Sequence, residues 1–380
     1  MKTMTRTLFA CFLAVACVAR AAWSQVPGYA LELRVPDVPH AVHTDAGTLV
    51  FQELHLTNFS AAPLRLSRVE VVDAQDGRLL AAWSGEALQR RFALIGATVA
   101  SPGLLVPPGR RGVVYIEWST QGQHPRMVEH VVTYTAQPDA PAAVVRGAPA
   151  AVSYPAEAAL GPPLRGGPWV AIHGAEWANG HRRVFNVVDG VARIPGRFAI
   201  DWVRVDAVGQ LARGDRDVPR NWLGYGADVL AVADATVVAV RDSMAESAKV
   251  SGNPRHALAE DAGNFVTIRL GDGRYAFYER LRPGSIVVSP GQHVRRGDVL
   301  GRLGFTGAST GPHLHFHVAD GPSPIGAEGR PFALDAFDLL GSYGDLGQLG
   351  NATWTPRRED ETERRQGEWP AENAVVRFPD

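Results

Sequence analysis

The sequence has no excess of positive charge, few cysteines and no long apolar run, and each of these absences excludes a class of protein. The formal net charge is −1 and no long basic run is present, so nucleic acid and anionic membrane surfaces are poor partners. Lysine occurs only as Lys2 and Lys249, and the other basic residues are Arg. Cys11 and Cys17 are the only cysteines, and both lie in an N-terminal apolar stretch, so no disulfides are expected beyond it. No segment reaches about 18 consecutive apolar residues, which argues against a membrane-spanning helix. Internal repeats, a phosphate-binding glycine loop and a Gly-x-Ser-x-Gly nucleophile elbow are also absent from the sequence.

The first 25 residues are expected to be an export signal. A short positive region precedes the apolar residues 8–18, and residues 19–21 form a small-x-small cleavage site. Export to the periplasm or the extracellular space follows from this prediction. Acylation of Cys17, as in a lipoprotein, is the alternative interpretation of the same segment.

A histidine-rich segment at residues 311–318 has the sequence Gly-Pro-His-Leu-His-Phe-His-Val. A strand sends alternate side chains to the same face, so His313, His315 and His317 would share one face while the Leu and Phe between them pack behind. Neutral imidazole is a common zinc ligand and also serves as a general base near neutral pH. The pattern therefore predicts a metal hydrolase site, and hydrogen-bonded surface histidines are the alternative.

Four segments together resemble the lysostaphin/LytM-type zinc metallopeptidases, which cut peptide crosslinks in bacterial cell walls. Ser-Thr-Gly-Pro-His-Leu-His-Phe at residues 309–316 is the most specific of them. The others are residues 225–234, 263–268 and 290–301. The resemblance covers roughly residues 165–340.

The resemblance implies which residues hold zinc. In this family the metal is held by the His and Asp of a His-x-x-x-Asp segment and by the second His of the His-x-His strand. The first His of that strand and the His of a Tyr-x-His-Leu segment polarise the water and stabilise the oxyanion. Residues 197–201 and 278–281 are the matching segments. Asp201 and His315 are thus the implied zinc ligands, and His313 is an implied catalytic residue.

Two matching positions carry arginine in place of histidine: Arg197 at the first ligand and Arg280 at the catalytic position. A guanidinium has no lone pair to donate, so Arg197 is an altered ligand position and is expected to form a bidentate pair with Asp201. Arg280 remains a candidate catalytic residue, because a cation can stabilise an oxyanion without shuttling a proton. Catalytic zinc normally keeps three protein ligands, and the motifs supply two, so zinc occupancy is the open question.

Further histidines offer a third ligand. His317 lies on the same expected strand face as His315, although alternate strand residues are about 6.6–6.8 Å apart and both rings would have to lean inward. The other histidines that can approach from loops are His173, His181, His256 and His293.

The expected fold is all-β. Short strands separated by turns over residues 28–155 predict an immunoglobulin-like β-sandwich, with a linker at residues 156–167 rich in Ala, Gly and Pro. A compact antiparallel β domain of the peptidase type, with long loops, is expected at residues 168–345. The densely charged residues 346–380 are expected to form a polar tail, in which Trp369 and residues 375–378 are able to dock onto the body.

Three functions follow from these observations. The first is a zinc metalloendopeptidase of the cell envelope acting on peptidoglycan peptide crosslinks. The second is an inactive relative that binds wall peptides or regulates another envelope hydrolase, favoured by Arg197 and Arg280. The third is a structural envelope protein whose N-terminal domain provides the function. The surviving His-x-His strand and Asp201 favour the first.

Overall fold

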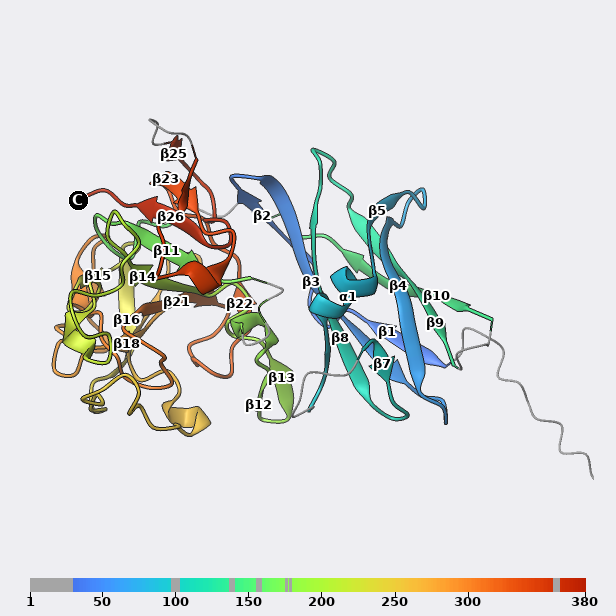
Figure 1. The fold of residues 1–380 in the computed structure, drawn as a ribbon, viewed down its shortest axis with the longest axis horizontal. Helices are drawn as coiled ribbons and strands as arrows, with labels where there is room; N and C mark the ends of the chain where they lie inside the picture. The colour runs from blue at the N-terminus through green and yellow to red at the C-terminus, as the bar shows by residue number, and fades with distance from the viewer. Residues whose placement is uncertain are drawn as a thin grey trace, which may run out of the picture.

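Antiparallel β-sheets dominate the computed structural model, as expected for an all-β chain (Figure 1). The structure describes residues 30–96, 103–136, 141–154, 159–174, 177, 180–357 and 363–380. The expected export signal at residues 1–25, with both cysteines, lies outside these residues. In the described part of the chain no helix is long and apolar enough to cross a membrane.

Two five-stranded antiparallel sheets make up the N-terminal lobe, on the right in Figure 1. One sheet has the order β1-β3-β8-β6 with β2 paired to β3, and the other has the order β10-β9-β4-β5 with β7 paired to β4. The two sheets share one apolar core, formed where alternate strand residues such as Leu54, Leu56, Val69 and Val71 turn inward. The immunoglobulin-like topology itself stays a prediction. The elements are β1 (Leu31–Arg34), β2 (His40–Thr44), β3 (Gly47–Asn58), β4 (Leu64–Asp73), β5 (Leu79–Ser84), α1 (Gly85–Arg91), β6 (Phe92–Leu94), β7 (Leu105–Val106), β8 (Arg111–Ser119), β9 (Met127–Thr135) and β10 (Ala143–Ala151).

One twelve-stranded antiparallel sheet organises the C-terminal lobe, with the order β19-β16-β17-β18-β21-β14-β11-β26-β23-β24, β22 paired to β21 and β25 to β23. Two smaller pairs, β12-β13 and β15-β20, flank it. The strands are β11 (Trp169–Ile172), β12 (Asn186–Val188), β13 (Val191–Arg193), β14 (Ile200–Arg204), β15 (Asp228–Leu230), β16 (Ala235–Arg241), β17 (Asn264–Arg269), β18 (Tyr275–Leu281), β19 (His293–Val294), β20 (Val299–Arg302), β21 (Leu314–Ala319), β22 (Gly329–Arg330), β23 (Phe337–Ser342), β24 (Thr355–Pro356), β25 (Glu363–Arg365) and β26 (Ala374–Arg377). Four 3-10 turns interrupt the loops: η1 (His181–Arg183), η2 (Pro219–Asn221), η3 (Leu258–Glu260) and η4 (Leu346–Gln348).

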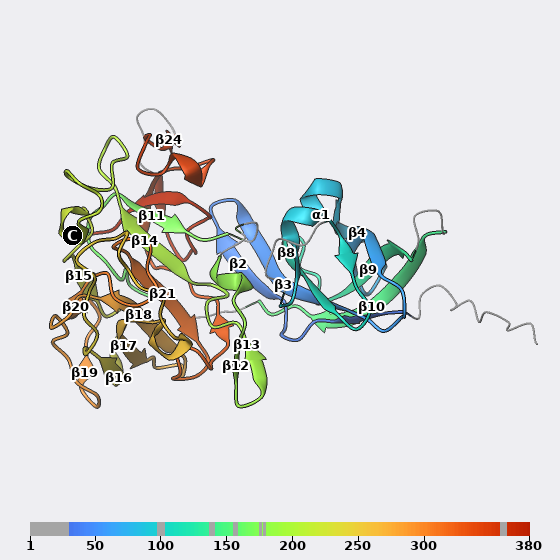
Figure 2. The same ribbon diagram turned by 60° about the horizontal axis from the view of Figure 1, so that its bottom comes forward.

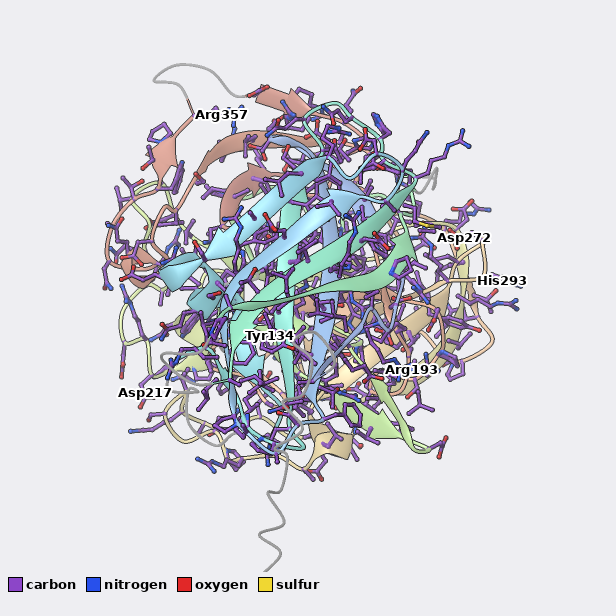
Figure 3. The ribbon with its side chains drawn as sticks, turned by 90° about the vertical axis from the view of Figure 1, so that its right-hand side faces the viewer. Tyr134, Arg193, Asp217, Asp272, His293 and Arg357 are labelled. Atoms are coloured by element: carbon purple, nitrogen blue, oxygen red, sulfur yellow. The ribbon has the colours of Figure 1, made fainter. Side chains whose placement is uncertain are left out.

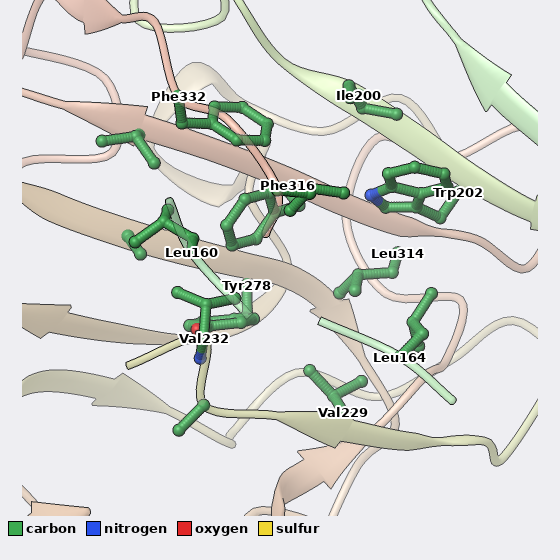
Figure 4. Close-up of a cluster of buried hydrophobic side chains, with 14 of the residues drawn as sticks. Leu160, Leu164, Ile200, Trp202, Val229, Val232, Tyr278, Leu314, Phe316 and Phe332 are labelled. Carbon is green, nitrogen blue, oxygen red and sulfur yellow. Dashed lines mark hydrogen bonds between the residues drawn. The ribbon is translucent and has the colours of Figure 1, made fainter. Parts of the chain in front are cut away.

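The apolar core of this lobe lies on one face of the central strands (Figure 4). Leu314 and Phe316 of β21 are fully buried there beside Trp202 and Tyr278 of the neighbouring strands. The predicted alternation is therefore present, because the apolar residues of the histidine segment face the core and the histidines face the opposite side. Core packing thus fixes the register of the strand that carries the histidines.

The segment expected to be a linker packs against the C-terminal lobe. Leu160 and Leu164 are buried in its core, and the Leu160 amide donates to the Ala333 carbonyl at 2.8 Å. Two apolar side chains within an Ala/Gly/Pro-rich stretch are enough to hold it on the lobe.

The prediction that residues 346–380 form a polar tail is wrong for the last part of this segment. β26 pairs with both β11 and β23, and the Trp369 side chain is buried against Phe51 and Phe198. Charge density predicted a solvated segment, but the apolar residues at its end complete the sheet. The alternative that Trp369 and residues 375–378 dock onto the body describes what the structure has.

The two lobes meet where the β2–β3 hairpin reaches the C-terminal lobe (Figure 2). Val42 and Phe51 of this hairpin belong to the core of the C-terminal lobe, and the Trp369 amide donates to the His43 carbonyl at 2.8 Å. The β12–β13 hairpin lies on the same side of the C-terminal lobe, facing the N-terminal lobe.

Candidate metal centre

Three adjacent strands bring the candidate site together. Asp201 on β14 lies opposite His315 on β21, and His315 lies opposite Glu279 on β18. Antiparallel pairing places directly opposite side chains on the same face, within about 4.5–5.5 Å at Cβ. The strand order β18-β21-β14 therefore forms a row of carboxylate, imidazole and carboxylate.

Asp201 is the centre of a histidine cluster. The His315 Nδ1 atom lies 2.9 Å from Asp201 Oδ1, the His181 Nε2 atom lies 3.1 Å from Asp201 Oδ2, and the His313 Nε2 atom lies 3.4 Å from Asp201 Oδ1. Burial by itself would raise the pKa of Asp201, but the neighbouring imidazoles hold that pKa well below its ordinary value. The carboxylate is therefore ionised at neutral pH.

His181, Asp201 and His315 suit a metal ion. Their donor atoms lie within 4.8 Å of one another. Tetrahedral zinc with bonds of about 2.0–2.2 Å needs ligand atoms separated by roughly 3.3 Å, close to the distances in this cluster. Two imidazoles and one carboxylate also supply the three protein ligands that a catalytic zinc normally keeps.

Burial keeps His315 in the form that binds metals. Burial, followed by the charge of His181, lowers the pKa of His315 to about 3, so its imidazole is neutral at physiological pH. The His315 Nε2 atom lies 3.1 Å from His317 Nδ1. If Nδ1 of His315 is the ligand atom, Nε2 carries the proton and donates it to His317, which orients the His315 ring.

His317 thus lies behind His315 and away from Asp201. Its ring stacks on Phe277 at 4.4 Å, and its Nδ1 atom lies 3.9 Å from Glu279 Oε1. Glu279, His315 and His317 form a second group whose donor atoms converge. Glu279 is buried, and burial raises its pKa to about 7.

The ring of His313 has a defined orientation. Its Nδ1 atom lies 2.7 Å from the Gly311 carbonyl oxygen, to which it donates, so Nε2 carries the lone pair and faces Asp201. Ser309 donates its hydroxyl proton to the same carbonyl at 2.7 Å and lies 3.2 Å from the ring. Ser309 is therefore part of the turn that holds His313.

Arg280 lines the same cavity of about 70 Å³ as His181, His315 and His317. Its side chain is buried, and its Nε and Nη1 atoms have no hydrogen-bond partner among the described residues. No described carboxylate forms an ion pair with it within 4.0 Å. Its φ of 70° is a left-handed conformation that a non-glycine residue rarely adopts. Buried donor atoms without a hydrogen-bond partner are costly, which is typical of a residue kept for a ligand.

The expected pairing of Arg197 with Asp201 is wrong. The Arg197 guanidinium binds three other carboxylates, those of Glu53, Asp37 and Glu328, at 2.8, 2.8 and 2.6 Å. Two of these carboxylates belong to the N-terminal lobe, which the four-residue spacing in the motif could not reveal. Asp201 is therefore free of competition from the arginine.

Among the four loop histidines, only His181 reaches the cluster. His173 binds the Pro370 carbonyl at 2.9 Å and stacks on Trp369, and His256 lies 3.7 Å from Glu260. His293 lies at the periphery, 3.1 Å from the Thr236 hydroxyl (Figure 3). No sequence motif distinguishes His181 from the other three, and none pointed to Glu279.

Comparison with known proteins shows that part of this chain matches a protein family. The model for peptidase family M23 matches residues 223–327, which include Arg280, His313, His315 and His317. The chain is 41% identical over 66 residues to Peptidoglycan DD-endopeptidase ShyA of Vibrio cholerae and 33% identical over 116 residues to Peptidoglycan DD-endopeptidase ShyB of the same organism. These matches cover 17% and 30% of this chain but only 15% and 23% of the two relatives.

Among solved structures, the match to a zinc containing peptidase from Vibrio cholerae covers 78% of this chain and 85% of the peptidase chain. The sequence identity is 17% and the TM-score is 0.26. The family match and the motifs agree on the same segment of the chain. Residues 223–327 are a peptidase family M23 domain.

Proposed function

We propose that this chain is an exported zinc endopeptidase that hydrolyses peptide crosslinks of peptidoglycan. The observation that carries the proposal is the convergence of His181, Asp201 and His315 within 4.8 Å. The substrate class rests on the two relatives, both named peptidoglycan DD-endopeptidases.

His181 Nε2, one Asp201 oxygen and His315 Nδ1 would hold the zinc ion. Zinc bound there supplies a Lewis acid that polarises a carbonyl group and lowers the pKa of water. Asp201 is ionised and His315 is neutral at physiological pH, as ligands must be. His317 supports His315 by accepting its Nε2 proton at 3.1 Å, an outer contact that fixes the ring orientation.

His313 is the proposed proton acceptor. Its Nε2 lone pair faces the cluster, and burial lowers the pKa of this imidazole, so the neutral form predominates. The Gly311 carbonyl holds the ring in that orientation from the other side. A water molecule beside Asp201 would lie within reach of this lone pair, which is the geometric requirement for a general base.

Arg280 is the proposed oxyanion stabiliser. Its unpartnered Nε and Nη1 donors lie in the cavity that His181 and His315 also line. A fixed cation in a water-poor site stabilises negative charge that develops during acyl transfer. It cannot return a proton to the leaving amine, so His313 would serve both proton transfers.

Arg280 also supports a second candidate function. A guanidinium without a counter-ion would pair well with a carboxylate of a wall peptide, so an inactive relative would use the same cavity for binding. This candidate predicts binding of wall peptides without cleavage.

Digestion of purified peptidoglycan tests the proposal. The wild-type chain should release uncrosslinked peptides, detected by mass spectrometry, and Asp201→Asn and His315→Ala should release none. His293→Ala is the matched control, because this histidine lies outside the cluster and should leave cleavage unchanged. Binding of the peptides by a wild-type chain that never cleaves them would support the inactive relative instead.

A further inference from the structure

The N-terminal lobe contributes to the metal site by holding His181 in place. We infer that Arg182 is a positioning residue, clamped by strands β3 and β8, which fixes the adjacent His181 against Asp201. This inference rests on the proposed function, since it concerns the same zinc ligands. It gives the N-terminal lobe a role in catalysis beyond that of a spacer.

Arg182 is almost fully enclosed by the N-terminal lobe. Its Nε and Nη1 atoms donate to Glu53 at 2.6 Å and to Glu117 at 2.9 Å. Its Nη2 atom donates to the backbone carbonyls of Gln52 at 2.8 Å and Ile116 at 2.9 Å. All four partners belong to β3 or β8, and the residue is only 4% exposed. A planar guanidinium held by four acceptors has one orientation, so the backbone that carries it is fixed as well.

The next residues dock on the same lobe. The Arg183 guanidinium lies 4.9 Å from the Tyr115 ring centroid and donates to the Arg90 carbonyl. Phe185 meets His55 edge to face at 5.7 Å and packs against Val113 and Tyr115. Arg182, Arg183 and Phe185 therefore bind the N-terminal lobe, while His181 faces Asp201.

The His181 side chain contacts Asp201, His315 and Trp177, but among the described residues no backbone hydrogen bond joins η1 to the strands of the C-terminal lobe. The backbone hydrogen bonds of η1 are local, from Arg183 to Gly180 and from Val184 to His181. The following strand β12 pairs with β13, and among the described residues neither strand joins the twelve-stranded sheet. The position of His181 therefore depends on the contacts that its neighbours make with the N-terminal lobe.

One buried carboxylate ties both sides of the metal site to that lobe. Glu53 accepts from Arg182 through one oxygen and from Arg197 through the other, at 2.6 and 2.8 Å. Arg182 adjoins His181, and Arg197 lies in the turn at residues 195–198 that leads to Asp201. Glu53 thus sets the spacing between the segment that carries His181 and the segment that carries Asp201. Arg197, at the position where the family motif has a zinc ligand, anchors the second segment to the N-terminal lobe.

Zinc affinity of the full-length chain tests this inference. We would compare wild type with Arg182→Met and with Arg357→Met, which breaks a different bridge between the lobes, the one from Arg357 to Asp45 at 2.8 Å. Zinc dissociation constants would come from competition with a chelating dye. The visible spectrum of the cobalt(II)-loaded chain would report the number of protein ligands. Loss of a group that orients a ligand weakens metal binding by about 10–100-fold, so Arg182→Met should show this loss while Arg357→Met binds as wild type.

Each result has a defined meaning. Equal zinc affinity and identical cobalt spectra in wild type and Arg182→Met would overturn the inference but leave the proposed function intact. A wild-type chain that binds no zinc would overturn both. If Arg182→Met does not fold, Glu117→Gln removes one clamp contact and should weaken zinc binding in the same direction, and unchanged affinity in that variant would overturn the inference.

Discussion

At two residues of this site the structure differs from the arrangement that the family motif implies. Arg197 stands at the expected ligand position but binds Glu53, Asp37 and Glu328, and His181, twenty positions from Asp201, faces that carboxylate instead. The motif could predict that Asp201 and His315 come together, because they lie opposite each other on paired strands. It could not identify His181, since the path of a loop depends on contacts with the other lobe.

Arg197→His should not create a better zinc site. The change removes the closest cation of Glu328 and leaves Glu53 with Arg182 alone, and breaking a buried ion pair costs about 3–5 kcal/mol. Urea denaturation should show that loss in the free energy of unfolding, while zinc affinity does not rise. Tighter zinc binding by this variant would contradict this expectation, because it would mean that a histidine at position 197 acts as a zinc ligand.

Arg280→Met should stabilise the fold and impair cleavage. Removing a buried, unpaired cation relieves a desolvation penalty of about 1–3 kcal/mol, whereas losing an oxyanion donor typically lowers turnover by about 10²–10³-fold. The melting temperature and the rate of peptidoglycan digestion would be measured on the same preparation. A variant that melts lower and cleaves normally would contradict both assignments for Arg280.

The sequence pattern predicts a strand correctly where one face of the strand is buried. It fails for the strand near the C-terminus. The alternation in residues 314–318 predicted β21 because core packing and strand period agree. The charged residues before β26 made the sequence predict a solvated tail there. The position of β26 between β11 and β23 results from pairing with strands that are distant in the sequence. Local composition carries little information about such pairing.

Phe378→Ala tests the contribution of this last strand. The Phe378 ring is buried against Trp202 at 5.1 Å, so its truncation should lower the free energy of unfolding by about 3–5 kcal/mol. Phe59→Ala is the matched control, because Phe59 is 70% exposed and its loss should change stability by at most about 0.5 kcal/mol. Equal effects of the two substitutions would mean that β26 does not hold the sheet together.

The molecule as a whole should lose stability as the pH falls below neutral. Burial lowers the pKa values of His55, His130 and His173 to about 4, so the unfolded chain binds more protons between pH 6.5 and 4. The free energy of unfolding should be highest above pH 6.5 and fall by roughly 1–2 kcal/mol per histidine by pH 5. Glu279 acts in the opposite direction because burial raises its pKa to about 7, but it is one group against three.

Urea denaturation at pH 7.5 and pH 5 measures this change. His130→Asn removes one titrating group and should reduce the loss by the contribution of that histidine, roughly 1–2 kcal/mol. A free energy of unfolding that is constant or rises on acidification would show that these histidines are not buried in the neutral form.

The zinc content of the purified full-length chain, compared with that of His181→Ala and His317→Ala, tests the central claim most directly. The account predicts one zinc ion per wild-type chain and its loss in His181→Ala, whereas His317→Ala keeps the ion with reduced affinity. Zinc retained by His181→Ala but lost from His317→Ala, or a wild-type chain without zinc, would contradict it.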